Sequence, residues 1–164
     1  MSPTGPTPLP LLATLLLSAA LAAQGDAAPA SGDCPTGDPK AFEAMMDRTI
    51  FAAGEAYAAF EREEQRAITA EADALVADEV WTEQQRGAFF VDALEAPAFR
   101  DEQRLKDETL LPRYLRALQA ITMTASDDDC ARAKEALATF EDITASGKRQ
   151  YAWMRERLRA ARTR

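Results

Sequence analysis

The sequence contains no histidine. Histidine is the commonest general base and the commonest ligand of transition metals, so its absence removes the usual basis of both kinds of site. Nucleophilic systems of the Ser-His-Asp or Cys-His type are excluded, and so is a di-iron bundle with its paired Glu-x-x-His motifs. We therefore expect no enzyme activity, no cofactor and no metal. Acidic residues are abundant, which leaves a carboxylate-based hydrolase as an alternative, although no pair of acids stands out.

Glycine and strand-like patterns are also scarce. The glycines beyond residue 37 are isolated, at Gly54, Gly87 and Gly147, so the sequence has no glycine-rich phosphate loop. No segment alternates polar and apolar residues with the period of two that a half-buried strand requires. The remaining composition is rich in Ala, Glu, Arg and Leu, which favours helices. These observations predict an all-α fold.

Long hydrophobic runs are missing as well. The longest apolar run covers residues 11–23, which is shorter than the ~20 residues of a membrane-spanning helix. It has the size of the hydrophobic region of a secretory signal peptide, and A-x-A cleavage patterns follow at residues 20–22 and 28–30. We predict a signal peptide over residues 1–22, with cleavage as late as residue 30, and export to the periplasm or the outside of the cell. An uncleaved hydrophobic anchor is the alternative.

The sequence has only two cysteines, Cys34 and Cys130. In an exported chain, two cysteines predict one disulfide. Closing a loop of about 100 residues would stabilise the fold by up to ~4.7 kcal/mol in the chain-entropy model. A covalent dimer or two free thiols are the alternatives. The C-x-x-C spacing of a redox-active pair is absent.

The apolar repeat predicts one domain, a bundle of four to five helices over residues 38–164, preceded by an extended arm over residues 23–37. Asp38 is a suitable N-cap and Pro39 suits the first helical position. The first helix is expected to run to about residue 79, either unbroken or with a break near residues 64–69. Its predicted buried stripe includes Phe42, Met46, Ile50, Tyr57, Phe60, Ile68, Ala72 and Leu75.

Two further helices are predicted between residues 82 and 123. Thr82 and Gln85 match a capping box, which starts a helix that runs to about Leu94. Pro97 ends this helix. In the next, over residues 98–123, Pro112 either kinks the helix or lies in the first turn of a new one. The side chains expected to be buried are Phe89, Phe90, Ala93, Leu94, Leu111, Tyr114, Leu118 and Ile121.

The last helix is predicted to begin at Ser126 or Asp127 and to keep its apolar repeat for about 30 residues. Three consecutive aspartates, residues 127–129, suit the positive end of the helix dipole. We interpret them as a solvated helix start, because the spaced ligands of a calcium loop are missing. Gly147 lies on the buried stripe, which predicts either the close approach of another helix or a local break.

The formal net charge is −8, yet residues 148–164 are mainly basic. We single out a candidate partner patch, made up of Lys148, Arg149, Arg155, Arg159 and Arg162. A basic amphipathic helix with a tryptophan can also lie on an anionic membrane surface. The basic segment can instead have a purely structural role. In that case the arginines pair with the acidic rest of the bundle, and Tyr151, Met154 and Leu158 continue the core stripe.

Residues 81–86, WTEQQR, resemble the L-T-x-x-Q motif of the periplasmic helical stress chaperones of the Spy and CpxP type. Trp81 stands in place of the leucine, and the motif occurs once. The resemblance implies a dimeric helical cradle that binds unfolded client proteins. The same residues are also explained by the capping box, so no functional residue is carried over from the family.

Together these features predict an exported helical protein that works by binding a partner, in the manner of an inhibitor or immunity protein, a chaperone or an envelope adaptor. The partner is expected to be another protein, and the acidic bundle suits a basic one. An anionic membrane surface bound through the last helix is the alternative. Nucleic acid is not expected as a partner, because export separates the protein from most of it. The oligomeric state stays open.

Overall fold

The computed structural model describes residues 34–163, which belong to one compact unit. The predicted signal peptide and residues 23–33 of the predicted arm lie outside the described residues. Between Cys34 and Thr163 the secondary structure is entirely helical, and it forms four helical rods. The all-α class is therefore confirmed, and so is the disulfide between Cys34 and Cys130, whose Cα atoms are 5.8 Å apart.

The first rod consists of α1 (Pro39–Met46), the π-helical turn η1 (Asp47–Phe51) and α2 (Ala52–Ala77). The Asp38 carboxylate caps it by accepting from the backbone N–H groups of Lys40 and Ala41, both at 3.1 Å. The rod continues without a break through residues 64–69. Its one irregularity is the wider turn η1, where the Thr49 hydroxyl donates to the carbonyl of Met45 at 2.7 Å.

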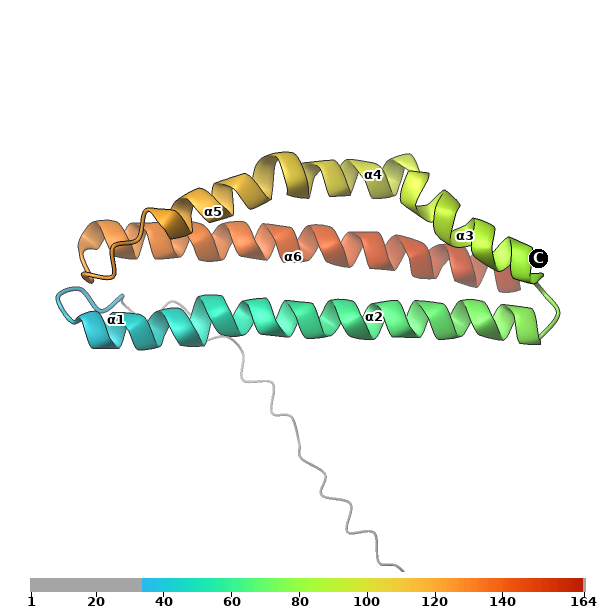
Figure 1. Cartoon of the computed structure of the whole chain (residues 1–164), viewed down its shortest axis with the longest axis horizontal. Helices are drawn as coiled ribbons and strands as arrows, with labels where there is room; N and C mark the ends of the chain where they lie inside the picture. Colours follow the sequence, from blue (N-terminus) through green and yellow to red (C-terminus); the bar gives the residue numbers. More distant parts are fainter. Residues whose placement is uncertain (1–33, 164) are drawn as a thin grey trace, which may run out of the picture. The chain divides into compact units, whose positions relative to one another are not determined.

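The next two rods form an arch, which Figure 1 shows above the other helices. It begins with α3 (Glu83–Glu95), which Thr82 and Gln85 open with the predicted capping box. At Ala96 the backbone is extended, with φ −61° and ψ 134°, and Pro97 follows as the first residue of α4 (Pro97–Arg104). The π-helical turn η2 (Leu105–Leu110) then leads directly into α5 (Leu111–Gln119).

Pro112 lies in the first turn of α5, directly after η2. A π-helical turn holds one residue more than an α-helical turn, so it rotates the helix that follows. Leu110, the last residue of η2, and Ala117 are buried, whereas Leu111 and Leu115 remain 42% and 44% exposed. The prediction that Leu111 is buried was therefore wrong.

The prediction for Leu94 was also wrong, because this side chain is 59% exposed. Phe89 and Ala93, four residues apart, form the inward face of α3. Leu94 follows Ala93 directly, so it points about 100° away from that face. Phe90 is half-buried at the edge of the core.

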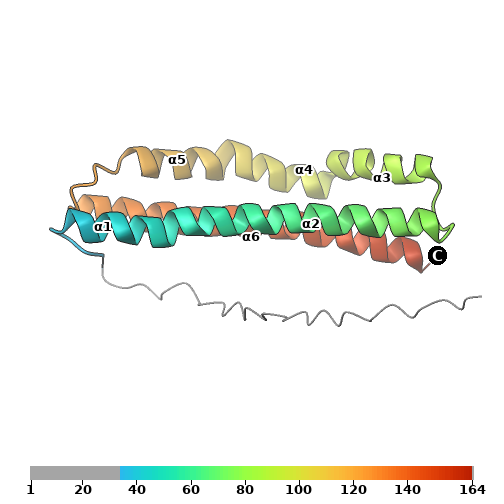
Figure 2. The same cartoon turned by 60° about the horizontal axis from the view of Figure 1, so that its bottom comes forward.

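The last rod is the long helix α6 (Asp127–Arg162), about 54 Å at 1.5 Å per residue. It is the central element, since α2, α4 and α5 all pack against it. Figure 2 shows α2 and α6 side by side, with the arch lying over them. The fold is therefore a bundle in which the first rod and the arch both pack against α6.

The core has two separate hydrophobic clusters. One lies around the disulfide and joins α1, α5 and the start of α6; its buried members are Phe42, Met46, Ile50, Ala117, Ala125, Cys130, Ala133 and Ala136. The other joins the second half of α2, α3 and the end of α6; its buried members are Ile68, Ala72, Leu75, Phe89, Ala93, Met154 and Leu158. The second cluster supports the candidate site described below.

Between the clusters, α6 carries buried polar side chains that the apolar repeat did not predict. Ser146 donates to Glu102 Oε2 at 2.7 Å, and Gln150 donates to the carbonyl of Phe99 at 3.0 Å. Gln150 Oε1 in turn accepts from Lys106 at 2.5 Å. These hydrogen bonds attach α4 and η2 to α6, because polar groups removed from water require partners inside the protein.

Gly147 lies in this middle region, and the predicted close approach of another helix is confirmed. A Cβ atom built on Gly147 would overlap the hydroxyl of Tyr57 from α2 and lie 2.8 Å from Tyr57 Cζ. The buried Tyr57 hydroxyl has no hydrogen-bond partner among the described residues. Burial raises the pKa of this hydroxyl, and the nearby Glu61 raises it further.

The helix start at residues 127–129 agrees only in part with the solvated cluster that we predicted, since Asp127 and Asp128 are exposed but Asp129 is not. Asp129 is buried, with 2% of its surface exposed. Its carboxylate accepts from the backbone N–H groups of Thr122, Thr124 and Ser126 at 2.6, 3.0 and 3.2 Å, and also from both threonine hydroxyls. These donors, led by the Thr122 N–H, hold the pKa of Asp129 well below its usual range. Asp129 thus organises the loop before α6.

Candidate functional site

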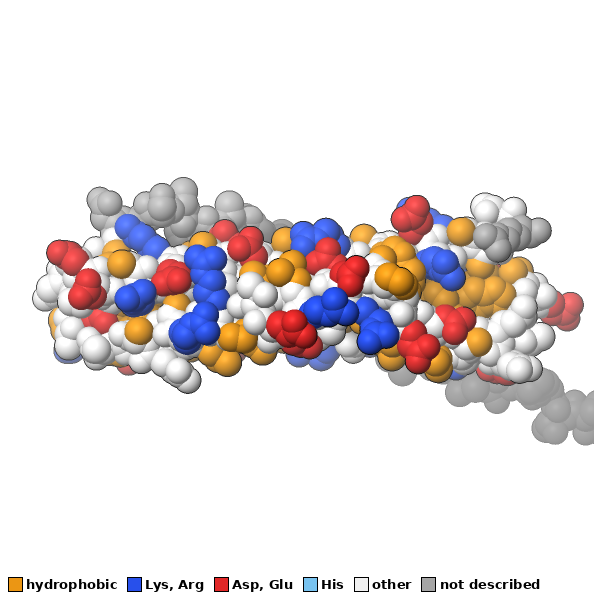
Figure 3. All heavy atoms as spheres, turned by 90° about the horizontal axis from the view of Figure 1, so that it is seen from above, with side chains coloured by type: hydrophobic (Ala, Val, Ile, Leu, Met, Phe, Trp, Pro, Cys, Tyr) orange, Lys and Arg blue, Asp and Glu red, His pale blue; other side chains and the backbone are white. Residues whose placement is uncertain are grey.

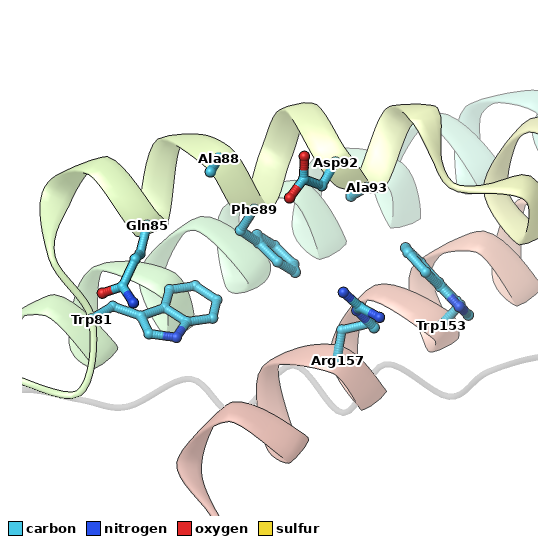
Figure 4. A pocket seen from close by; sticks show the side chains of 8 residues that line it. All are labelled: Trp81, Gln85, Ala88, Phe89, Asp92, Ala93, Trp153 and Arg157. Atoms are coloured by element: carbon cyan, nitrogen blue, oxygen red, sulfur yellow. The ribbon is translucent and has the colours of Figure 1, made fainter. Parts of the chain in front are cut away.

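An open cleft of about 220 Å³ lies between α3 and the end of α6, over the second core cluster. Figure 4 shows its walls, which are aromatic on both sides. Its lining residues are Trp81, Gln85, Ala88, Phe89, Asp92, Ala93, Trp153 and Arg157. Figure 3 shows hydrophobic side chains gathered at the α3 end of the arch, whereas charges of both signs alternate over its middle.

The α3 wall of the cleft is built by the turn that precedes the helix. After α2 the chain reverses through Glu79, which has a φ of 59°, and the backbone N–H of Trp81 donates to the carbonyl of Leu75 at 2.9 Å. Trp81 is thereby placed against Phe89, with ring centroids 5.3 Å apart, and Phe89 contacts Phe90 at 5.2 Å. The capping box fixes where α3 begins, so it also fixes this aromatic wall.

The α6 wall consists of Trp153 and Arg157, four residues apart on one face of the helix. The Arg157 guanidinium lies 5.4 Å from the centre of the Trp153 ring, which is a cation–π distance. In Figure 4 Arg157 stands in the cleft, between the Phe89 ring and Trp153. Arg157 forms no ion pair with any residue between Cys34 and Thr163.

Two polar side chains of α3 complete the lining. Gln85 is occupied, since its Oε1 accepts from the backbone N–H of Thr82 at 2.8 Å. Asp92 is exposed and forms no ion pair within the described part of the chain. Figure 4 shows the Asp92 carboxylate on the α3 side of the cleft. The cleft therefore combines aromatic walls with one available anion and one available cation.

The residues of the predicted basic patch lie on more than one side of α6. Arg155 binds Glu64 of α2 through two hydrogen bonds, at 2.6 and 3.1 Å, and Lys148 lies 5.8 Å from the centre of the Phe60 ring of α2. Arg149 instead binds Glu102 of α4, at 2.6 and 2.8 Å. This Arg149 pair lowers the pKa of Glu102.

The other two members of the predicted patch, Arg159 and Arg162, are exposed near the end of α6. The neighbouring apolar stripe is packed into the bundle, because Met154 and Leu158 are buried and Tyr151 contacts the Phe60 ring at 5.8 Å. This agrees with the structural interpretation of the stripe. That these basic residues form a binding patch for a partner remains a prediction.

A second groove, of about 640 Å³, lies between α2, α4, η2 and α6. Its walls carry both signs of charge, including Glu61, Arg100, Arg104 and Asp107. Lys106 is partly buried there, and burial lowers its pKa. Because Lys106 is already bound to Gln150, it belongs to the network that attaches the arch to α6. We therefore treat the aromatic cleft as the candidate site.

Sequence reasoning missed this cleft. In the sequence, Trp81 stood out only through the chaperone-like motif, and Trp153 only as the tryptophan of the basic amphipathic helix. Neither residue signals that α3 and the end of α6 come together, because contacts between distant segments leave no local pattern. The capping box was the one usable signal, since it fixes Trp81 directly before a helix.

Between residues 34 and 163 there is no group of three or more acidic or cysteine side chains that could hold a metal ion. None of the described helices is both long and apolar enough to span a membrane. No family model matches the chain, and neither the curated proteins nor the solved structures contain a match to it.

Proposed function

We propose that this chain acts by binding another polypeptide, and that the partner inserts a side chain into the aromatic cleft. The cleft is the observation that carries the proposal. Its volume of about 220 Å³ is smaller than the roughly 300–1,000 Å³ typical of small-molecule sites. Tryptophan, phenylalanine and arginine are enriched where protein partners meet, and a pocket of this size suits a single anchoring side chain.

The charged side chains of the cleft also agree with a role in protein binding. Asp92 and Arg157 line the cleft beside its aromatic side chains, and apolar contacts with polar groups next to them are usual in a protein interface. We propose in addition that the protein is exported and acts in the periplasm or outside the cell. The predicted signal peptide and the disulfide support this location.

The binding proposal can be tested by photo-cross-linking. Ala88 is exposed and lines the cleft, whereas Ala138 is exposed on α6 and does not line it. A photoreactive phenylalanine analogue placed at Ala88 should give a discrete adduct with one polypeptide in producing cells, and the same analogue at Ala138 should not. The partner is then identified by mass spectrometry and purified.

The purified partner allows a quantitative test. Ala88→Phe fills the cleft and should weaken binding at least tenfold in calorimetric titration, while the matched control Ala138→Phe should leave the affinity within twofold. Equal weakening by both substitutions, or none by either, would show that the cleft is not the contact site. Failure of the Ala88 position to give any adduct above the Ala138 background would argue against the proposal.

The proposed export can be tested separately, by cell fractionation. In fractionated producing cells, the protein should be recovered from the envelope or medium, with an N-terminus between residues 23 and 31 and with both cysteines oxidised. Recovery of the full-length, reduced chain from the cytoplasm would contradict export.

A further inference from the structure

The available charges of the cleft define the chemistry of its ligand more closely. Arg157 differs from its neighbours Arg149 and Arg155, because each of those is held by two hydrogen bonds to a carboxylate. Arg157 is exposed, lies at a cation–π distance from the Trp153 ring and forms no ion pair within residues 34–163. A guanidinium held against an aromatic ring keeps the N–H groups at its edge free, and these groups match the geometry of a carboxylate.

The opposite wall offers apolar surface. Trp81, Ala88 and Phe89 face Arg157 and Trp153 across the cleft (Figure 4). A ligand that places an anion on Arg157 can therefore pack an apolar group against this wall. Asp92, on the α3 side, can accept a hydrogen bond from an N–H donor of the same ligand.

The small volume of the cleft limits how these groups can be arranged. A space of about 220 Å³ lies below the size range of common ligand pockets, so the anion, the apolar group and the N–H donor come from a compact unit. The last residue of a polypeptide carries all three on one Cα atom: its terminal carboxylate, its side chain and its backbone N–H. An internal aspartate or glutamate would instead need a neighbouring residue to supply the apolar group.

We propose that the cleft binds the free C-terminal residue of a partner polypeptide, with an apolar last side chain. The carboxylate pairs with Arg157, the side chain packs between Trp81 and Phe89, and the last backbone N–H donates to Asp92. This inference rests on the proposed function, since it specifies which part of the partner enters the cleft.

The protein itself supplies a probe for the test. Its two tryptophans, Trp81 and Trp153, both line the cleft, so intrinsic fluorescence reports on occupancy. The oxidised protein is titrated with the acetylated peptide Gly-Ser-Gly-Ser-Leu as the free acid and as the C-terminal amide. A third peptide, ending in Leu-Glu amide, carries an internal acid beside the same apolar side chain. Calorimetry confirms each affinity independently of fluorescence.

We expect the free acid to bind at least tenfold more tightly than either amide. Arg157→Gln should reduce this preference to less than twofold. Arg159→Gln is the matched control, because Arg159 is exposed on the same helix but does not line the cleft, and it should keep the preference.

The other outcomes separate the two proposals. If the free acid and the amides bind equally, the C-terminal inference is wrong, while binding of a polypeptide side chain in the cleft stands. Equal binding of the free acid and the Leu-Glu amide would mean that an internal acidic residue suffices, which also overturns the inference. If no peptide binds and Ala88→Phe leaves the affinity for the cross-linked partner unchanged, the proposed function itself fails.

Discussion

The contact between Tyr57 and Gly147 allows a quantitative test of the packing between α2 and α6. The Tyr57 hydroxyl is buried against Gly147 without a hydrogen-bond partner in the described structure. An unsatisfied buried polar group costs about 1–3 kcal/mol. Tyr57→Phe removes this cost and leaves only a small void, so we expect the free energy of unfolding to rise by about 1 kcal/mol.

Gly147→Ala should act in the opposite direction. Alanine favours a helix over glycine by about 1 kcal/mol, but the new methyl group would overlap the Tyr57 hydroxyl. Overpacking of this kind costs about 1–3 kcal/mol, so the net effect should be a loss of about 1 kcal/mol. In the Tyr57→Phe background the hydroxyl is gone, but the new methyl group would still lie 2.8 Å from Cζ of the ring, so the ring has to shift. The loss should then become smaller, which gives a coupling of about 1 kcal/mol between the two substitutions.

Urea unfolding of the oxidised protein, followed by circular dichroism, measures all four members of this cycle. Tyr151→Phe serves as a control, because the Tyr151 hydroxyl accepts from Gln65 at 3.2 Å and its removal should not stabilise the protein. If Tyr57→Phe destabilises the protein by more than about 1 kcal/mol, the hydroxyl has a partner and the reasoning is refuted. Strictly additive effects would refute the predicted overlap with Gly147.

The same contact predicts a pH dependence. Because burial raises the pKa of Tyr57, the folded protein keeps this proton at a pH where the unfolded chain has lost it. The unfolded state therefore binds fewer protons, and stability should fall as the pH rises above 10, the ordinary pKa of tyrosine. Tyr57→Phe should show a shallower fall, measured by urea unfolding at several alkaline pH values, and an identical slope would count against the burial of this hydroxyl.

Two further predictions concern the disulfide end of the bundle. Replacing both Cys34 and Cys130 by alanine opens a loop with a sequence separation of 96. Urea unfolding should then show a free energy of unfolding lower by up to about 4.7 kcal/mol. A loss below about 1 kcal/mol would contradict the stabilising role of the disulfide. Asp129→Asn should lower the melting temperature markedly at neutral pH, whereas the exposed control Asp128→Asn should not, because only Asp129 binds the loop before α6. Since the pKa of Asp129 is lowered in the folded state, the contribution of its carboxylate to stability should be present above the ordinary pKa of 3.8 and should be lost as the pH falls below that value. Equal melting temperatures for Asp129→Asn and Asp128→Asn would show that the buried carboxylate is not required.

Local patterns identified most of the helices because their signals are short in range. The cap at Asp38, the capping box of Thr82 and Gln85 and the start of the last helix at Ser126 all depend on side chains that bind backbone N–H groups within a few residues. Gly147 was identified as a point of close approach because it interrupts an otherwise apolar stripe. The disulfide followed from the number of cysteines.

Register was less predictable, since the wide turns η1 and η2 leave no clear mark in the sequence. Leu110, the last residue of η2, is buried in place of Leu111, although the apolar spacing had placed Leu111 in the core. The three aspartates before Cys130 look alike in the sequence. Only the spacing of Ser126 and Asp129, which matches a capping box with aspartate as its acid, could have distinguished the buried one.

The sequence by itself determined that this protein is helical, because residues three and four apart share one face of a helix and their character can be read directly. The tertiary structure alone decided that Trp81 and Trp153 form one cleft and that Arg157, unlike Arg149 and Arg155, keeps its charge available. The physical reason is that pairing between helices depends on the angles and registers at which they pack. These are set by side chains throughout the core, and no single segment contains that information.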